Sequence, residues 1–378
     1  MTIVSRRGIL SGLGATAAAA ALPPAALAQA RPGLGVLAEK AGVLFGASIG
    51  SEALKDPAYG KLYAAETKII TTDMALKFDV LRPRQDTFNF GPADALLDFA
   101  ERNKLLMRGH TLIWNENAPD WLKRLNGAET ARVMDEHIEK VASRYAGKLH
   151  SWDVVNEPFW PDHGKQFGFR TGPWLEAMGP SYIKRAFNRV RSIDKTARLT
   201  LNEAHCEIEN SWGKGIRPRL LQLVDAMLDQ GLPLHAVGLQ AHLQPQWDYN
   251  DEAFEVFVAE LATRKIDIYI TEMDVNDEAF PANPAQRDAK VAERYAEFLR
   301  RVMTVPRVRM LVTWQLADRY SGYRNEALAR NPSASRLPRP LLFDDEFRRK
   351  PAYEAVSQVF TRGDVTLAAS RRDSVNVW

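Results

Sequence analysis

Short apolar segments rich in β-branched residues recur along the chain, and each is followed by a mixture of polar and apolar residues with helical spacing. Within 129–146, for example, Val133, His137, Val141 and Tyr145 recur every four residues and define one face of a helix. Alternating strands and helices favour a parallel sheet, because each crossover helix returns the chain to the same end of the sheet. The apolar segments are 42–49, 68–73, 105–113, 150–156, 198–202, 236–242, 266–272 and 309–316.

These strand-and-helix units predict a closed (β/α)8 TIM barrel of the α/β class, with its chemistry at the C-terminal ends of the strands. An open doubly wound sheet is the alternative, but no glycine-rich phosphate loop follows the first predicted strand. A chain of 378 residues, 46% of them hydrophobic and 26% charged, can bury one large core. We therefore predict a single catalytic domain over residues 31–362, followed by a tail at 363–378 that carries little pattern.

The first 30 residues differ in kind from the rest of the chain. Ser5-Arg6-Arg7 precede an alanine-rich apolar run, which reaches the small-x-small sequence Ala28-Gln29-Ala30. This arrangement resembles a twin-arginine export signal cleaved after Ala30, and it predicts a periplasmic or secreted protein. A membrane anchor is the competing interpretation, but glycines interrupt the run and Pro23-Pro24 stop it, so it is too short to span a bilayer.

Charge and cysteine content narrow the classes of partner. The formal net charge is +3, and loss of Arg6 and Arg7 with the signal leaves 48 basic against 47 acidic residues, or +1. A near-neutral chain without basic clusters argues against nucleic acid and against stable membrane insertion after cleavage. Cys206 is the only cysteine in the sequence, which excludes an internal disulfide and fits export of an already folded protein. We predict that Cys206 is an inert thiol and that the protein is a monomer.

Two glutamates each end a predicted strand. Glu157 lies in the run WDVVNEP, and Glu272 lies in YITEMDV. Hydrolysis of a glycosidic bond needs one carboxyl group that protonates the leaving oxygen and another that attacks or stabilises the anomeric carbon. Glutamates at the ends of two strands of one parallel barrel can supply that pair. The alternative for Glu157 is a plain loop start, since Pro158 blocks further strand pairing.

Polar and aromatic residues at other strand ends extend the candidate site. A charge among apolar neighbours, as at Glu272, is costly unless it is paired or functional. His242 and Asp274 could hold this carboxylate ionised and oriented, which would leave Glu157 to carry the proton. A core histidine is the alternative for His242, and core packing is the alternative for each tryptophan. The other candidates, which could bind sugar hydroxyls or stack on pyranose rings, are Asn156, Gln240, His110, Lys77, Trp114 and Trp314.

Histidines and carboxylates are also the ligands of catalytic metals, which is a competing use for these residues. None of the seven histidines in the sequence forms an HExxH motif or a comparable close pair. We therefore predict that the protein works without a metal and without another cofactor.

Further blocks accompany these residues in a fixed order, and together they resemble glycoside hydrolase family 10, the retaining endo-β-1,4-xylanases. The blocks are GHTLIW, RYAGKLHSWDVVNEP, GPSYIKRAF, VGLQAHL, YITEMDV, VTWQLAD, PLLFD and KPAY, between about Phe45 and Tyr353. The resemblance implies that the protein cleaves internal β-1,4 bonds of xylan by double displacement, which requires two carboxyl groups about 5–5.5 Å apart. It implies Glu157 as the acid/base and Glu272 as the nucleophile, with Asp274 and Asp153 in support. The implied contacts to the cleaved sugar are Asn156, His110, Lys77, Gln240, His242, Trp114 and Trp314.

The chain departs from the family pattern at several positions of the expected cleft. Asp73-Met74 stands where Glu-Asn is usual, and Asn115-Glu116-Asn117 stands where His-x-Gln is usual. The fifth strand ends in Asn202-Glu203-Ala204 where a tyrosine is common in third place, and an expected tryptophan falls on Gly322, beside Tyr323. Each lost hydrogen bond or stacking platform costs on the order of 1 kcal/mol or more of binding. The carboxylate pair is intact, so we expect the chemistry to survive and the subsite preference to shift.

Three hypotheses follow from this pattern. The favoured one is an exported retaining endo-β-1,4-glycanase that acts on xylan. The second keeps the chemistry and changes the polymer, to a substituted xylan or another β-1,4-linked polymer such as a bacterial exopolysaccharide. The third is a non-catalytic glycan-binding barrel, motivated by the altered cleft positions, although the presence of both glutamates speaks against it.

Overall fold

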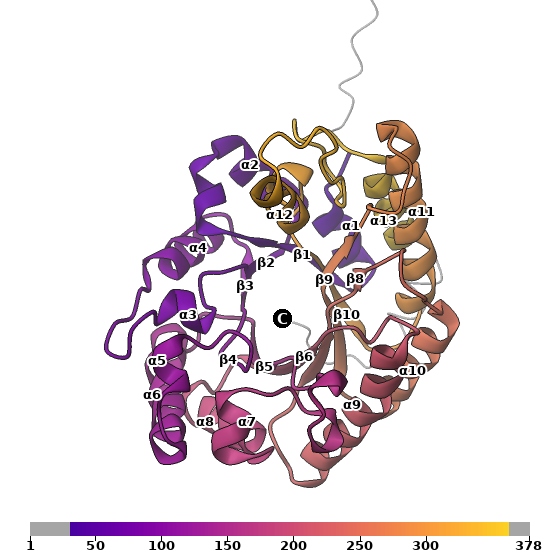
Figure 1. Cartoon of the computed structure of the whole chain (residues 1–378). Coiled ribbons are helices and arrows are strands. Elements are labelled where there is room, and N and C mark those ends of the chain that lie inside the picture. The colour runs from indigo at the N-terminus through magenta and orange to yellow at the C-terminus, as the bar shows by residue number, and fades with distance from the viewer. Residues whose placement is uncertain (1–30, 363–378) are drawn as a thin grey trace, which may run out of the picture. The chain divides into compact units, whose positions relative to one another are not determined.

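The computed structural model describes residues 31–362, so the predicted export signal and the predicted tail lie outside the described residues. Within this range, eight parallel strands follow one another around a closed ring, in the order β1, β2, β3, β5, β6, β7, β9 and β10 (Figure 1). The ring closes because β10 pairs with both β9 and β1. This confirms the predicted (β/α)8 barrel, and the closing pairs exclude an open sheet.

Each predicted apolar segment contains a strand, and two of the segments are divided into a longer and a shorter piece. In the third segment β4 follows β3 and pairs with β5, and in the sixth β8 follows β7 and pairs with β9. The strands are β1 Leu44–Ile49, β2 Ile69–Thr72, β3 Leu106–Gly109, β4 Ile113–Trp114, β5 Ser151–Asn156, β6 Arg198–Glu203, β7 Ala236–Leu239, β8 His242–Leu243, β9 Asp267–Val275 and β10 Val308–Thr313.

Helices surround the ring, and polar caps fix where several of them begin (Figure 1). The α-helices are α1 Leu34–Lys40, α2 Pro57–Glu66, α3 Phe78–Leu81, α4 Gly91–Arg102, α5 Asp120–Lys123, α6 Gly127–Tyr145, α7 Pro173–Met178, α8 Ser181–Ile193, α9 Ser211–Asp229, α10 Asp251–Thr263, α11 Pro284–Val302, α12 Gly322–Arg330 and α13 Pro351–Thr361. The 3-10 helices are η1 Ser51–Lys55, η2 Pro161–His163, η3 Gln166–Gly168 and η4 Asp318–Tyr320. In the described part of the chain, no helix is both long and apolar enough to cross a membrane.

Helix α6 illustrates how the sequence builds this outer layer. Asn126 and Glu129 form a reciprocal capping box that satisfies backbone donors at its start. The face predicted from the four-residue spacing, which includes Val133 and Tyr145, is buried against the barrel. Burial of such apolar faces removes nonpolar surface from water and supplies the main driving force for packing the helix layer.

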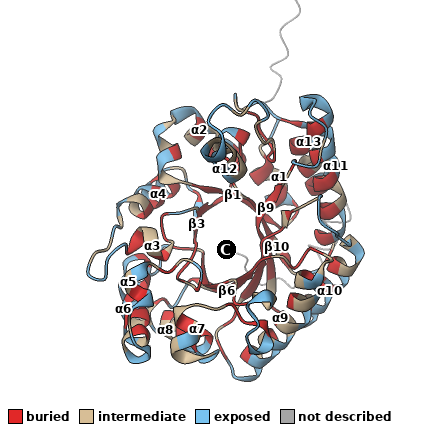
Figure 2. Cartoon of the chain, in the orientation of Figure 1, coloured by how far each residue is buried: buried red, intermediate tan, exposed pale blue. Residues whose placement is uncertain are grey.

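The core lies inside the ring and between the ring and its helices (Figure 2). Every residue of β1 and β5 is buried, as expected for parallel strands that are covered on both faces. Exposed residues gather on the outer sides of the helices (Figure 2). The polar residues that lie buried at the strand ends are therefore the exceptions that point to a site.

Candidate active site

The C-terminal ends of β5 and β9 carry the two glutamates, and neighbouring strands fix the backbone of both. The Glu157 N–H donates to the Asn202 carbonyl at 2.8 Å, and the Glu272 N–H donates to the Gln240 carbonyl at 3.0 Å. The side chains are 12% and 6% exposed, respectively. Because all the barrel strands run parallel, both carboxyl groups belong to the same end of the barrel.

Three amide side chains connect the two carboxyl groups through hydrogen bonds. Gln240 donates through Nε2 to Glu157 Oε1 at 2.8 Å and to Asn156 Oδ1 at 3.4 Å. Asn202 donates through Nδ2 to Asn156 Oδ1 at 2.9 Å and to Glu272 Oε1 at 2.8 Å. This network brings Glu157 and Glu272 to one shared place, and it leaves the Asn156 Nδ2 buried without a protein partner.

The environment of Glu272 keeps its carboxylate charged. The His242 ring lies between two carboxylates, with Nε2 3.3 Å from Glu272 Oε2 and Nδ1 2.9 Å from Asp274 Oδ1. Burial lowers the pKa of His242, but the two carboxylates raise it well above its ordinary value. Burial likewise raises the pKa of Glu272, but the charges of His110 and His242 outweigh burial and lower it to about 2. Glu272 is therefore ionised at neutral pH, as a nucleophile must be.

His110 is held on the other side of Glu272 by Asp153. Its Nδ1 lies 2.9 Å from Asp153 Oδ2 and 3.9 Å from Glu272 Oε1. Asp153 also pairs with the buried Arg108, so its second oxygen is occupied. Asp153 thus orients His110.

Lys77 and two tryptophans lie together beside the histidines. The Lys77 ammonium is 5.4 Å from the centre of the Trp114 ring and 5.7 Å from that of Trp314. The Trp314 ring is in turn 5.4 Å from His110 and 6.0 Å from His242. The lysine can donate to a sugar hydroxyl while the half-buried indoles offer apolar faces.

Arg170 binds the carboxyl group of Glu157, and the sequence analysis did not predict it as a site residue. Its side chain donates to the Glu157 carboxylate at 2.6 Å and to the Glu157 carbonyl at 3.0 Å, and it also pairs with Glu116. It lies in the irregular segment between β5 and α7, 13 residues after Glu157, where no periodicity links the two positions. Asn202 was also missed as a site residue, although it occupies the same place at the end of β6 as Asn156 does at the end of β5.

A third carboxyl group lies beneath Glu157. Glu203 is fully buried and accepts hydrogen bonds from the backbone N–H groups of Phe159 and Ala204, at 3.2 and 2.9 Å. Burial, together with the charge of Glu157, raises the pKa of Glu203 well above its ordinary value. A neutral Glu203 can support the backbone after β5 without adding a second negative charge beside Glu157.

Four residues that follow barrel strands at the site have a left-handed backbone, as do five other non-glycine residues elsewhere in the described part of the chain. Glu157, His205, Ala241 and Gln315 have φ angles of 47°, 60°, 59° and 77°. These residues follow β5, β6, β7 and β10, and non-glycine residues rarely adopt such left-handed conformations. Strained residues of this kind cluster at functional sites, where the surrounding structure holds them in place.

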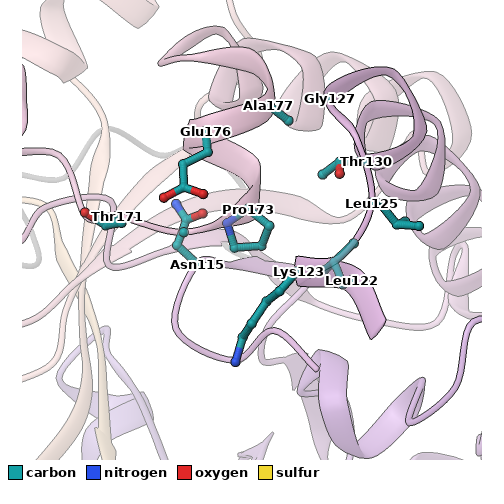
Figure 3. A pocket seen from close by; sticks show the side chains of 11 residues that line it. Asn115, Leu122, Lys123, Leu125, Gly127, Thr130, Thr171, Pro173, Glu176 and Ala177 are labelled. Carbon is teal, nitrogen blue, oxygen red and sulfur yellow. The ribbon is translucent and has the colours of Figure 1, made fainter. Parts of the chain in front are cut away.

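The positions at which the sequence departs from the family pattern fall into two groups. Asn115 has a structural role, since its Oδ1 accepts from the N–H groups of Trp174 and Leu175 and caps the start of α7. Figure 3 shows Asn115 in the wall of a hollow formed with residues of α5, α6 and α7. Asn117 has a buried Oδ1 without a protein partner.

The second group changes the space at the barrel mouth. Asp73 accepts from Gln315 Nε2 at 2.8 Å, while the neighbouring Met74 is 44% exposed. At Gly322 an added Cβ would meet nothing within 4 Å, so the place of the expected tryptophan is open. The adjacent Tyr323 donates to Asp274 Oδ1 at 3.3 Å and so joins the His242 network. The space at Gly322 is thus open, while Tyr323 adds a hydrogen bond to the residues that support Glu272.

Cys206 is buried, and burial raises the pKa of its thiol well above the ordinary value, so it stays protonated. Among residues 31–362, no group of three or more histidine, cysteine, aspartate or glutamate side chains is arranged to hold a metal ion.

Comparison with known proteins gives a consistent result. The family model for glycosyl hydrolase family 10 matches residues 33–359. A β-1,4-xylanase from Dictyoglomus thermophilum is 29% identical over 305 residues, 78% of this chain and 82% of the relative. Endo-1,4-β-xylanase B from Thermotoga neapolitana is 28% identical over 345 residues, 86% of this chain and 91% of the relative. The crystal structure of xylanase 10B from Thermotoga petrophila with xylobiose superimposes with a TM-score of 0.76 at 29% identity, covering 87% of this chain and 97% of that one.

Proposed function

The chain belongs to glycosyl hydrolase family 10, and from this premise we propose that it is a retaining endo-β-1,4-xylanase in which Glu272 is the nucleophile and Glu157 the acid/base. The observation that carries the assignment is the network of Gln240, Asn156 and Asn202, which joins the two carboxyl groups at one place. The environments of the two carboxyl groups also differ, as the two roles require.

The first step forms a covalent glycosyl-enzyme. The ionised Glu272 oxygen attacks the anomeric carbon, the bond from that carbon to the glycosidic oxygen breaks, and the leaving oxygen takes the proton of Glu157. Asn202 and His242 hold the attacking carboxylate in place. The orphaned Nδ2 of Asn156, beside both glutamates, is available to a sugar hydroxyl.

In the second step Glu157 acts as a base, where it acted as an acid in the first. Glu157, now ionised, takes a proton from water, the water oxygen attacks the anomeric carbon, and the ester bond to Glu272 breaks. Two inversions at the same carbon leave its configuration unchanged. Arg170 and Gln240 keep the Glu157 carboxyl group in one orientation during both steps.

Azide rescue of two variants tests the assignment of both roles. Glu157→Ala should form the glycosyl-enzyme from an activated xyloside, and azide should then displace Glu272 and give a β-xylosyl azide. In Glu272→Ala azide should occupy the place of the nucleophile and give an α-xylosyl azide. Proton NMR distinguishes the two products. The same anomer from both variants, or xylan hydrolysis unaffected by either substitution, would contradict the assignment.

The open space at Gly322 favours a second candidate within the same chemistry, namely a β-1,4-linked polymer that carries substituents. A side chain on the sugar would fill the volume that the missing tryptophan leaves. Product analysis on linear xylan, substituted xylan, cellulose-like glucan and a secreted bacterial polysaccharide separates these substrates. Binding to xylan without turnover on any of them would favour the non-catalytic barrel.

We further propose that residues 1–30 direct export by the twin-arginine route, because Ser5-Arg6-Arg7 precede an apolar run that reaches Ala28-Gln29-Ala30. Replacement of Arg6 and Arg7 by lysine should retain the protein in the cytoplasm of a bacterial host with this route. Cell fractionation and mass spectrometry of the exported N-terminus measure both parts of the proposal. We also propose a monomer, which light scattering tests directly.

A further inference from the structure

Three tryptophans and a histidine come together from the segments that follow β5, β6 and β8. Trp160 follows β5, His205 follows β6, Trp212 lies at the start of α9, and Trp247 follows β8. The Trp160 and Trp212 ring centres are 4.9 Å apart, and Trp212 and Trp247 are 5.9 Å apart. His205 lies 5.5 Å from both Trp160 and Trp212. We call these residues the four-ring cluster.

The cluster is open to solvent, unlike the indoles of the core. Trp152 and Trp174 are fully buried, whereas Trp160, Trp212 and His205 are half-buried and Trp247 is 36% exposed. Burying such large apolar rings is favourable, so a group of them left exposed on one surface marks a binding site. Burial also lowers the pKa of His205 to about 4, so its ring is uncharged at neutral pH.

Contacts between the loops hold the rings in place before any ligand arrives. The Trp160 N–H donates to the Gly168 carbonyl at 2.8 Å, so the loop after β5 folds back on itself. The loops after β6 and β8 pair through a bridge between Ile208 and Tyr249. The Trp212 indole N–H donates to the Asp162 carboxylate. A surface that is already ordered binds a ligand with little loss of conformational entropy.

Arg170 connects the cluster to Glu157. Its guanidinium lies 4.5 Å from the centre of the Trp160 ring, and it donates to the Glu157 carboxylate at 2.6 Å. The aromatic surface therefore begins beside the proton donor. An acid that protonates the leaving oxygen lies next to the part of the substrate that departs.

The end of β6 lacks an aromatic side chain of its own. Ala204 is buried at the position where the sequence led us to expect a tyrosine, and His205, which follows it, turns a ring into the cluster. The cluster thus supplies aromatic faces, from other positions, in the region where that ring is absent.

We propose that the four-ring cluster binds the departing part of the polysaccharide, with pyranose rings of a β-1,4-linked glycan lying on its indole faces. This inference rests on the proposed function, and it assigns Trp160, Trp212 and Trp247 to substrates whose leaving group is a sugar chain. The same surface binds the incoming sugar when the glycosyl-enzyme transfers its glycosyl group to a carbohydrate acceptor in place of water.

Two substrates with the same glycosyl part test the proposal. β-Xylobiosyl fluoride releases fluoride, which cannot reach the cluster, whereas xylotetraose releases a sugar chain. Trp247→Ala and Trp212→Ala should each lower kcat/KM for xylotetraose by roughly three- to tenfold and leave kcat/KM for the fluoride unchanged. Trp247→Phe keeps an aromatic face and should recover part of the loss. Val256→Ala, an exposed apolar position in α10 outside the cluster, is the control and should leave both rates unchanged.

The possible outcomes separate the cluster from the proposed function. An equal loss of kcat/KM on both substrates would show that the cluster only supports the fold. Unchanged kcat/KM on both would show that it does not bind the substrate. Either result overturns the proposal. Thermal unfolding of each variant shows whether the fold is intact, and the more exposed Trp247 carries the test if Trp212→Ala unfolds. An unaltered protein that cleaves neither substrate would overturn the proposed function, and this inference with it.

Discussion

The two glutamates lie in surroundings that are built in different ways. Glu272 is supported by residues at the ends of strands, namely His110, Asn202, His242 and Asp274. Glu157 receives one hydrogen bond from Gln240, at the end of β7, and the other from Arg170 in an irregular loop. The barrel itself thus fixes the nucleophile, while the loops add the partner of the proton carrier and the aromatic surface beside it. We expect the chemistry to be tied to the strands and the choice of leaving group to the loops.

The largest effect is expected from removal of the nucleophile. Glu272→Ala should lower kcat on both xylotetraose and β-xylobiosyl fluoride by at least about 10⁴-fold, because it removes the carboxylate that forms the covalent bond. Glu157→Ala should lower the rate on xylotetraose by roughly 10²- to 10⁴-fold. With azide present it should retain most of its activity on the fluoride, which needs no proton to leave. A similar loss on both substrates in both variants would show that Glu272 and Glu157 do not have separate roles.

Arg170→Ala should have the next largest effect, confined to the loop side. The Glu157 carboxyl group would lose its 2.6 Å partner, and we expect kcat on xylotetraose to fall by roughly 10- to 100-fold through loss of orientation. The initial release of fluoride from β-xylobiosyl fluoride should change much less, because that step does not use the acid. Arg219→Ala, in α9, is the matched control for loss of an arginine near this loop. Equal losses on both substrates would show that Arg170 supports the whole site.

Asp274→Asn tests the support of Glu272 by His242 through the pH dependence of activity. Asp274 is the main charge that raises the pKa of His242, so its neutralisation should make His242 lose its proton at a lower pH. A protonated His242 donates to Glu272, so activity that depends on it is complete below the His242 pKa and is lost as pH rises through that value. The alkaline limb of kcat/KM should therefore move to lower pH, with about a tenfold loss near pH 8.

The pH profile from 5 to 9 on β-xylobiosyl fluoride isolates this effect from the acid/base. Tyr323→Phe removes a hydrogen bond from Asp274 and keeps its charge, so it should shift the limb far less. A limb that stays in place in Asp274→Asn would show that the charge of His242 does not govern the nucleophile.

The smallest effect is expected from a substitution at Gly322, where the open space can hold an aromatic side chain. Gly322→Trp should lower KM for linear xylotetraose by roughly two- to fivefold, since an indole there would add an apolar face. The same change should raise KM for a substituted xylan if the space now receives a substituent. Gly322→Ala, which adds no ring, is the control. A lower KM for both substrates would show that the space serves no substituent.

Sequence periodicity predicted the barrel and most of the strand-side residues because both depend on the same repeat. A residue such as Glu272 or His242 stands out when it interrupts an apolar strand, and parallel strands end on one side of the barrel. Arg170 and Trp247 cannot be recognised in this way, because loops have no repeating pattern. Their contacts also join positions that are far apart in the sequence. Asn115 shows a role that the sequence did not indicate, because its side chain caps the start of α7.

The left-handed backbone at Glu157 has a consequence for the stability of this protein. A φ of 47° suits glycine better than glutamate, so replacement by glycine would relieve strain on the order of 1 kcal/mol even as it removed the proton carrier. The same replacement would take away the carboxylate that pairs with the buried Arg170 and accepts from Gln240, and this loss opposes the relief of strain. The strained backbone therefore persists because the site requires the Glu157 carboxyl group.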